Sequence, residues 1–193
     1  MAKMRNALPI LALALSGCIS FGGKAPAQLF GLTPAHVAPA GAGASGSLAD
    51  AIVVLEPQTD QRLAVLRVPV QIDDASIAYL KDAMWVERPS RLFRSLLAET
   101  IRSRGGRLVL EVSAADSGGK VRLSGRLLDM GYDARQGAVV VRYDASREDA
   151  GGAVSVKRFE SIVRGVAPKA EAVGPALNRA ANDVASQVAD WVG

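Results

Sequence analysis

The sequence has almost none of the residues that thiol, metal and histidine chemistry requires: one cysteine, Cys18, and one histidine, His36, among 193 residues. A lone cysteine cannot form a disulfide within the chain, and with a single histidine it cannot complete a zinc site. A Ser-His-Asp triad would have to use His36, which lies in a Pro- and Ala-rich stretch with no neighbouring acid. We therefore expect a non-enzymatic protein with no metal or other cofactor, and an exposed His36.

Long apolar runs are also missing. The longest strongly apolar run, Ala7 to Leu15, falls short of the roughly 20 residues that cross a bilayer, which excludes a polytopic membrane protein. The composition, 49% hydrophobic and 22% charged, is near the globular average and excludes a wholly disordered or collagen-like chain. The length fits one folded domain preceded by a targeting segment.

Basic charge is too sparse for a nucleic-acid footprint. The formal net charge is +4, and Lys3 and Arg5 supply two of these charges from the extreme N-terminus. The densest basic stretch runs from Arg88 to Arg107, and only Glu87 and Glu99 offset its positive charge. We interpret it as a solvated helix face, with contact to lipid phosphates or an acidic partner as the alternative.

The N-terminus has the three parts of a secretory signal. A positive segment, 1–6, is followed by an apolar segment, 7–15, and then by the small residues Ser16 and Gly17 before Cys18. The run Leu15-Ser16-Gly17-Cys18 resembles a bacterial lipobox. The resemblance implies that Cys18 acquires a diacylglycerol and that residues 1–17 are removed as a lipoprotein signal peptide. An inert thiol, or a chance cysteine beside an ordinary signal peptide, is the alternative.

Lipidation of Cys18 would anchor the protein permanently, because acyl chains contribute about 0.8 kcal/mol per buried CH₂. In many bacteria with two membranes, Asp directly after the lipidated cysteine retains the protein at the inner membrane. Here that residue is Ile19. We therefore expect a lipid anchor on the periplasmic face of the outer membrane.

Residues 18–49 are rich in Gly, Ala, Ser and Pro and contain one charged residue, Lys24, which indicates a tether. Residues 28–33 alternate in apolar character and could form an edge strand at the start of the domain. The nine residues 19–27, if free, span about 16 Å on average, so the domain would lie close to the membrane.

Residues 50–193 are expected to form a single α/β domain. Apolar residues at helical spacing predict two amphipathic helices, one from Pro89 to Gly105 and one over 173–191, in which Gly174-Pro175 marks either a kink or the true start. Extended patterns predict strands over 52–55, 63–70, 76–80, 107–112, 120–132, 138–144 and 154–163. We expect the first two strands to pair as neighbours, with hairpin turns at Gly118-Gly119 and Gln136-Gly137. The helices then pack on one mixed sheet.

Three smaller features have structural explanations. Asp73-Asp74 suggests paired carboxylates, but adjacent side chains diverge and Ala-Ser follows, so we interpret the pair as a turn or helix cap. The two Gly-Gly-Lys runs, at 22–24 and 118–120, lack the rest of a phosphate-binding loop. Trp85, Tyr79 and Tyr132 are expected to be packing residues.

The whole pattern resembles the auxiliary lipoproteins of ABC-type transport systems, the lipoprotein component of mammalian-cell-entry transporters. The resemblance covers most of the chain from Cys18 to Trp191. It rests on the lipobox, Phe30-Gly31-Leu32-Thr33-Pro34, Val68-Pro69-Val70, Asp73-Asp74, Ile77-Ala78-Tyr79-Leu80 and Trp85-Val86-Glu87-Arg88-Pro89, with Leu92, Phe93 and Leu96-Leu97 after it.

The resemblance implies a mixed sheet similar to the N-terminal domain of the translocation protein TolB, ring-like self-association into a homo-oligomer, and no catalytic residues. It implies partnership with a mammalian-cell-entry protein and, through it, with an ABC permease and an ATPase that move lipids between membranes. The alternatives are a structural or assembly lipoprotein of the envelope and, last, a tethered hydrolase.

The anchor has a direct test. Cys18→Ala removes the only thiol that can be acylated, so we expect no incorporation of labelled palmitate and either release from membranes or stalled processing. Labelling with palmitate followed by membrane fractionation checks this. Retained label in the variant would contradict lipidation at Cys18.

Overall fold

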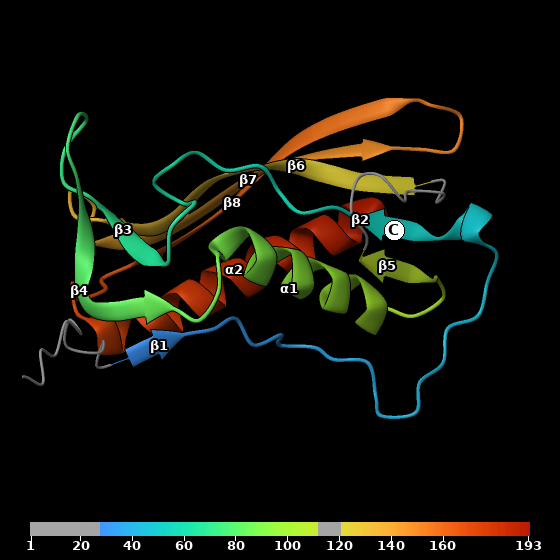
Figure 1. Cartoon of the computed structure of the whole chain (residues 1–193), viewed down its shortest axis with the longest axis horizontal. Coiled ribbons are helices and arrows are strands. Elements are labelled where there is room, and N and C mark those ends of the chain that lie inside the picture. The colour runs from blue at the N-terminus through green and yellow to red at the C-terminus, as the bar shows by residue number, and fades with distance from the viewer. Residues whose placement is uncertain (1–27, 112–120) are drawn as a thin grey trace, which may run out of the picture.

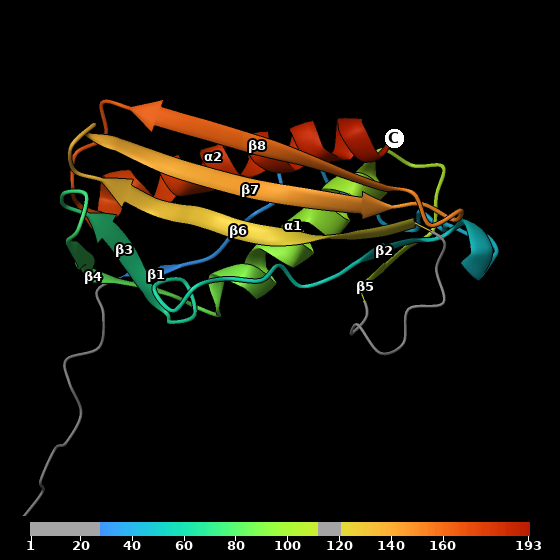
Figure 2. The ribbon, with the colours of Figure 1, turned by 90° about the horizontal axis from the view of Figure 1, so that it is seen from above.

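Three long antiparallel strands form the centre of the structure. The computed structural model describes residues 28–111 and 121–193. In it, β6 (Val121–Asp133) pairs with β7 (Ala138–Glu148), which pairs along its whole length with β8 (Val154–Arg164). Each turn contains a glycine with positive φ, Gly137 at 56° and Gly152 at 80°, a conformation that other residues rarely adopt. The strands therefore form a meander, and β8 lies at its edge (Figure 2).

The other edge of β6 is shared by two strands. β2 (Ile52–Val54) pairs in parallel with the start of β6, and β3 (Arg67–Gln71) pairs in parallel with its end. The predicted pairing of the first two strands with each other is therefore wrong, because β6 is long enough for both to lie along it one after the other. The eight-stranded sheet divides beyond β6 into two arms (Figure 1).

One arm holds β4 (Ile77–Trp85), antiparallel to β3, and β1 (Gln28–Phe30), parallel to β4. The other arm holds β5 (Val109–Glu111), parallel to β2 and preceded in sequence by α1. A 3₁₀ turn, η1 (Leu48–Asp50), leads into β2. β1 lies within the segment in which we predicted an edge strand.

Both helices cover the same face of the sheet, α1 (Pro89–Ser103) and α2 (Ala170–Val192) (Figures 1 and 2). Pro89 suits the first turn of α1 because that position has no helical partner for an N–H. The buried faces of the two helices consist of apolar residues at the predicted helical spacing: Phe93, Leu96, Leu97 and Ile101 in α1, and Val173, Leu177, Ala180, Val184 and Val188 in α2. The predicted α/β class, one mixed sheet with two amphipathic helices, is confirmed.

Edge-to-face aromatic pairs connect the helices and the sheet. The ring of Phe93 in α1 lies 5.2 Å from that of Tyr143 in β7, and the ring of Phe159 in β8 lies 5.6 Å from that of Trp191 in α2. Trp85 and Tyr132 are buried, and Tyr132 donates a hydrogen bond to the Val166 carbonyl at 2.8 Å. The predicted packing roles of Trp85 and Tyr132 are confirmed, whereas Tyr79 is half-buried, with the Arg67 guanidinium 3.8 Å from the centre of its ring.

Several predicted boundaries differ from the structure. β3 begins at Arg67, and Leu63 is buried from the turn before it. α2 begins at Ala170, so Gly174-Pro175 lies inside the helix and does not start it. β5 does not form a hairpin with β6, because the fully buried β2 lies between them and all three strands are parallel. The predicted turn at Gly118-Gly119 lies outside the described residues.

The segment after β1 lies against the helices. The backbone N–H groups of Thr33 and Ala35 donate to the side-chain oxygens of Asn178 and Asn182 at 2.8 and 2.6 Å, and Asn182 donates back to the Thr33 carbonyl. The N–H of Ala38 donates to Glu99 of α1 at 2.8 Å. Part of the stretch assigned to the tether, 18–49, is thus held on the folded domain from Gln28 to Ala38.

Gly131 provides a test of the close contact between β3 and β6. A Cβ added there would overlap the carbonyl of Pro69. Gly131→Ala should therefore lower the free energy of unfolding by about 1–3 kcal/mol, as overpacking does elsewhere. Urea denaturation followed by circular dichroism measures this change.

Gly43→Ala is the matched control, because an added Cβ at that position has no atom within 4 Å. We expect a change of at most about 0.5 kcal/mol there. Equal stability of the two variants would contradict the close approach of β3 and β6.

Candidate functional site

Rows of charged side chains cross the face of the sheet that the helices leave open. One row consists of Asp129, Arg142 and Glu160, with Arg142 paired to both acids and 2.5 Å from Glu160. The rows run across β6, β7 and β8, whose residues lie opposite one another in the ladder. A neighbouring row places Asp144 between Arg126 and Arg158, and Asp144 pairs with Arg158 at 2.6 Å. The sign of the charge alternates from strand to strand in each row.

A bulge in β6 adds a further arginine to this face. The register with β7 shifts between Leu127 and Asp129, which takes the Leu128 carbonyl out of the regular ladder. Arg62, from the turn before β3, donates to that carbonyl at 2.5 Å and to Asp129 at 2.9 Å. The Arg62 guanidinium thereby provides a hydrogen-bond donor for the Leu128 carbonyl, although the two residues are more than sixty positions apart in sequence.

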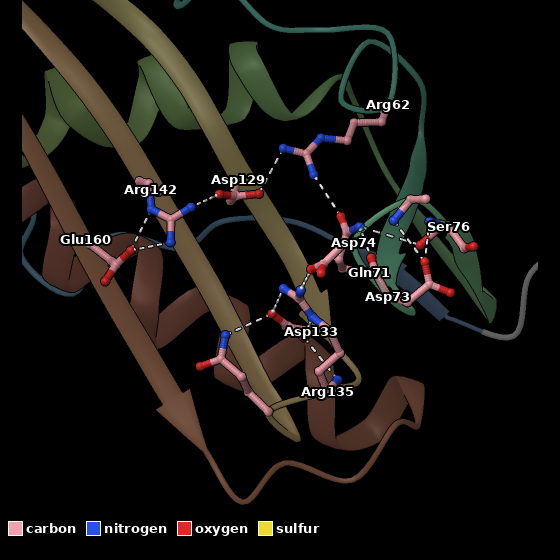
Figure 3. A network of polar contacts seen from close by, with 12 residues as sticks. Arg62, Gln71, Asp73, Asp74, Ser76, Asp129, Asp133, Arg135, Arg142 and Glu160 are labelled. Carbon is pink, nitrogen blue, oxygen red and sulfur yellow. Dashed lines mark hydrogen bonds and ion pairs between the residues drawn. The ribbon is translucent and has the colours of Figure 1, made fainter.

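Arg62, Asp129 and Arg142 lie around a polar hollow of about 290 Å³ (Figure 3). Pro69, Gly131, Tyr132 and Val140 contribute its apolar lining, and Gln71, Asp133, Arg135 and Gln136 join the charged residues at its rim. The volume is at the small end of the range for ligand sites, about 300–1,000 Å³, and the lining is more polar than is usual. Such a hollow suits a polar side chain or a small polar group.

Hydrogen bonds from arginine lower the pKa of two carboxylates on this face, Asp133 and Asp144. Hydrogen bonds from the Arg135 guanidinium, and then from Gln136 and the Arg135 backbone, hold the pKa of Asp133 far below its usual value against the opposing effect of burial. Arg158 lowers the pKa of Asp144 in the same way. A carboxylate that stays charged at every ordinary pH is a poor general acid. Asp133 is therefore a charged hydrogen-bond acceptor at the rim of the hollow.

The described residues, 28–111 and 121–193, contain no cluster of three or more His, Cys, Asp or Glu side chains placed to hold a metal ion. No helix within those ranges is long and apolar enough to span a membrane. Burial raises the pKa of the Tyr143 phenol, which donates to the Ser124 carbonyl at 2.7 Å and so serves the packing of the sheet.

A second hollow, of about 440 Å³, lies where the β3–β4 hairpin meets the start of α2. Its lining is mainly apolar, with two lysines, and comprises Val70, Ile72, Ala78, Tyr79, Leu80, Lys81, Asp82, Pro168, Lys169, Ala170 and Glu171. Ile72 and Ile77 of the hairpin are both partly exposed. Exposed apolar side chains thus lie beside this hollow.

The predicted lipidation site is outside the described residues: Leu15, Ser16, Gly17 and Cys18 all lie there, as do both Gly-Gly-Lys runs. His36 is exposed, as expected. Asp73 accepts hydrogen bonds from the N–H groups of Ala75 and Ser76, each at 2.8 Å, which confirms the turn. These bonds lower the pKa of Asp73.

The basic stretch of α1 is a solvated face with acidic partners. Arg91 lies 2.9 Å from Glu87, Arg94 lies 3.6 Å from Glu111, and Arg102 pairs with Glu99. Beyond α1, Arg104 lies 2.7 Å from Asp190 of α2. Two of these acids, Glu111 and Asp190, lie outside the basic stretch, so it carries less unpaired positive charge than its sequence indicates.

The sequence did not identify the charged rows or Arg62. Alternation along β7 and β8 could have indicated the rows, because Arg142, Asp144, Arg158 and Glu160 occupy every second position of their strands. The role of Arg62 had no such signal, since it depends on a bulge in a strand that is distant in sequence.

A family model described as "ABC-type transport auxiliary lipoprotein component" matches residues 30–189. A solved structure from Xanthomonas campestris is similar with a TM-score of 0.66 and 14% identity, over 86% of this chain and 91% of that one. A second, of an uncharacterized protein, has a TM-score of 0.62 and 16% identity, over 75% and 92%. At these identities the two structures show the fold alone. No curated protein matches the chain.

The buried carboxylate of Asp133 gives a pH-dependent prediction. Its folded pKa is depressed, so its contribution to stability is complete above the unfolded pKa, about 3.9, and is lost as pH falls through the folded pKa. Asp133→Asn should therefore cost about 2 kcal/mol at pH 7, and the difference from wild type should shrink below about pH 4.

Urea denaturation at several pH values measures this difference. Asp183→Asn, at an exposed position of α2, is the control and should differ little from wild type at any pH. An Asp133→Asn penalty that stays constant down to about pH 2 would contradict the assigned role of the charge.

Proposed function

Since the chain belongs to the family of ABC-type transport auxiliary lipoprotein components, we propose that it is the membrane-anchored, non-enzymatic adaptor of a mammalian-cell-entry lipid transport system. The observation that carries the proposal is the match over residues 30–189, which spans nearly all of the described chain. In this role the domain contacts a mammalian-cell-entry protein and, through it, an ABC permease and an ATPase.

Attachment through Cys18 is the first part of the proposal. Only nine residues, 19–27, separate Cys18 from β1, and the chain is hydrogen-bonded to the domain from β1 onward. Pulled straight, nine residues reach roughly 30 Å. The anchor thus holds the domain near the periplasmic face of the outer membrane, where Ile19 after the lipidated cysteine favours its sorting.

The anchor also favours one orientation. β1, the β3–β4 hairpin and the start of α2 lie at one end of the long axis (Figure 1). The C-terminus and the β7–β8 turn lie at the other end. A short tether at β1 keeps the first end toward the lipid and presents the second to the periplasm. The mainly apolar hollow beside the hairpin then faces the membrane.

The charges of the open face favour a role in contacting a partner protein rather than a role in catalysis. Each arginine around the polar hollow is paired with at least one carboxylate. The lowered pKa of Asp133 keeps that group from exchanging protons near neutral pH. Surfaces of paired charges favour specific orientation of a partner more than they add to affinity. An adaptor needs this ability to orient its partner.

Co-purification tests the proposed partners. An affinity tag after Gly193 lies at the end away from the anchor. We expect the tagged chain, solubilised from envelope membranes, to recover a mammalian-cell-entry protein together with an ABC permease and an ATPase. Quantitative mass spectrometry of the recovered proteins gives the measurement.

The control is residues 1–27 fused to an unrelated periplasmic domain, which keeps the proposed anchor and removes the family domain. It should recover none of the three partners. Recovery of a different envelope complex by the full chain would instead support the alternative, a structural or assembly lipoprotein unrelated to lipid transport. Equal recovery of the three partners by the fusion would contradict a role for the domain.

A further inference from the structure

The hollow between the β3–β4 hairpin and the start of α2 has charges of both signs in its lining. Lys81 and Lys169 are the cations, and Asp82 and Glu171 are the anions. Every ion pair between described residues has an arginine as its cation, and none of these four residues takes part in one. The arginines around the polar hollow, in contrast, are all paired. The charges beside the hairpin are therefore available to a ligand.

A bulge in β4 carries two of these charges. The register between β3 and β4 shifts between Arg67 and Pro69, and Lys81 and Asp82 belong to the additional residues of β4 at this point. Among the described residues, Asp82 is the one other than glycine with a positive φ, 56°. Such a backbone conformation costs free energy and is retained mainly where function requires it. The bulge thus holds Lys81 and Asp82 beside the hollow at a cost in backbone strain.

The rest of the lining is mainly apolar and comes from the hairpin and from the segment that leads into α2. It consists of Val70, Ile72, Ala78, Tyr79, Leu80, Pro168 and Ala170. A matching ligand carries an anion and a cation joined by short apolar carbon segments, with a size suited to about 440 Å³. The headgroup of a zwitterionic phospholipid has this composition, because two carbons join its phosphate to its ammonium group.

The hollow also lies at the end of the molecule that the proposed anchor holds near lipid. β1 and the hairpin share that end (Figure 1). Only residues 19–27 separate β1 from Cys18, and they reach roughly 30 Å when straight. The length of this segment and the place at which it joins the domain both favour a bilayer surface as the occupant.

The tip of the hairpin suits the headgroup region of a bilayer. Ile72 and Ile77 lie on opposite faces of the hairpin and are 45% and 44% exposed, so the tip is apolar on both sides. The two carboxylates between them have partners: Asp74 pairs with Arg135, and Asp73 accepts hydrogen bonds from the backbone of the turn. Both carboxylates therefore keep a partner where water is scarce.

We propose that this end of the domain docks on the bilayer that holds the anchor, with the headgroup of a zwitterionic phospholipid in the hollow. Lys81 and Lys169 bind the phosphate, and Asp82 and Glu171 bind the ammonium group. The apolar lining contacts the carbons between them, and the hairpin tip lies among neighbouring headgroups. The inference rests on the proposed anchor at Cys18 and adds a fixed orientation of the domain on the membrane.

A fluorescent label at the hairpin tip tests the docking. Ala75→Cys provides an exposed thiol in the turn, and a lipidated Cys18 has no thiol to react, so the label attaches at one position. The full-length protein is reconstituted in vesicles of phosphatidylethanolamine and phosphatidylcholine that contain a phospholipid with a quencher on its headgroup. We expect strong quenching of the Ala75→Cys label.

Leu48→Cys, exposed at the opposite end of the molecule from β1, is the control and should lose almost no emission. Flotation of the vesicles measures the anchor separately. A chain that does not float lacks the anchor, and the anchored function and the docking then fail together. A chain that floats, but whose Ala75→Cys label is quenched no more than the Leu48→Cys label, would overturn the docking alone.

Removal of single lysine charges tests the phosphate contact. Lys81→Gln and Lys169→Gln should each lower the ratio of docked to undocked domains about fivefold, as expected for the loss of one charged contact. Lys157→Gln, on β8 and outside the hollow, is the matched control and should leave the ratio unchanged. The quenched fraction of the Ala75→Cys label measures the ratio. Equal quenching in all three lysine variants would contradict the assigned contact.

Asp82→Asn distinguishes a zwitterionic headgroup from an anionic one. Asparagine tolerates a positive φ, so the substitution removes the charge and keeps the bulge. It should weaken docking on the zwitterionic vesicles but not on phosphatidylglycerol, which has no ammonium group. Asp183→Asn, exposed on α2, is the control and should change neither. Stronger docking of the wild-type chain on phosphatidylglycerol than on the zwitterionic mixture would overturn the assigned headgroup.

Discussion

β6 is paired along both edges, and its pairing with two separate strands on one of them determines the layout of the molecule. β2 lies along its first residues and β3 along its last, both in parallel. Between them the register with β7 shifts at Leu128, and Arg62 donates to the carbonyl that the shift leaves out of the ladder. Arg62 comes from the turn that separates β2 from β3. Arg62 therefore links the bulge in β6 to the point at which the sheet divides into two arms.

The same guanidinium connects this arrangement to the charged open face. Arg62 pairs with Asp129, Asp129 with Arg142, and Arg142 with Glu160 on the last strand. Exposed ion pairs contribute little singly, typically below about 1 kcal/mol. In a row they fix where each long side chain points, because Arg62, Asp129 and Arg142 each pair with opposite charges on two sides. Such a face favours neighbours of complementary charge and contributes little to the stability of the fold.

The sequence predicted the parts whose signals are local. Leu92, Phe93, Leu96 and Leu97 recur at helical spacing, and α1 begins at Pro89 as expected. The long strands and the aromatic core residues Trp85 and Tyr132 followed from composition and alternation. The pairing of β2 with β5 and β6 did not, since a three-residue apolar strand fits any buried position in a sheet. The hydrogen bonds of Asn178 and Asn182 to the segment after β1 join residues about 150 apart, and no local pattern indicates them.

Those asparagines have a mechanical consequence. β1 lies parallel to the final residues of β4, so a force applied at Gln28 along the axis of β1 acts parallel to both strands. A pull applied from the N-terminal side therefore loads the backbone bonds of β1 together with the asparagine bonds in shear, all at once. A hairpin pulled from its open end would instead lose its bonds one at a time. Force applied at Gln28 is thus shared between the edge of the sheet and α2, and it acts on the domain as a whole.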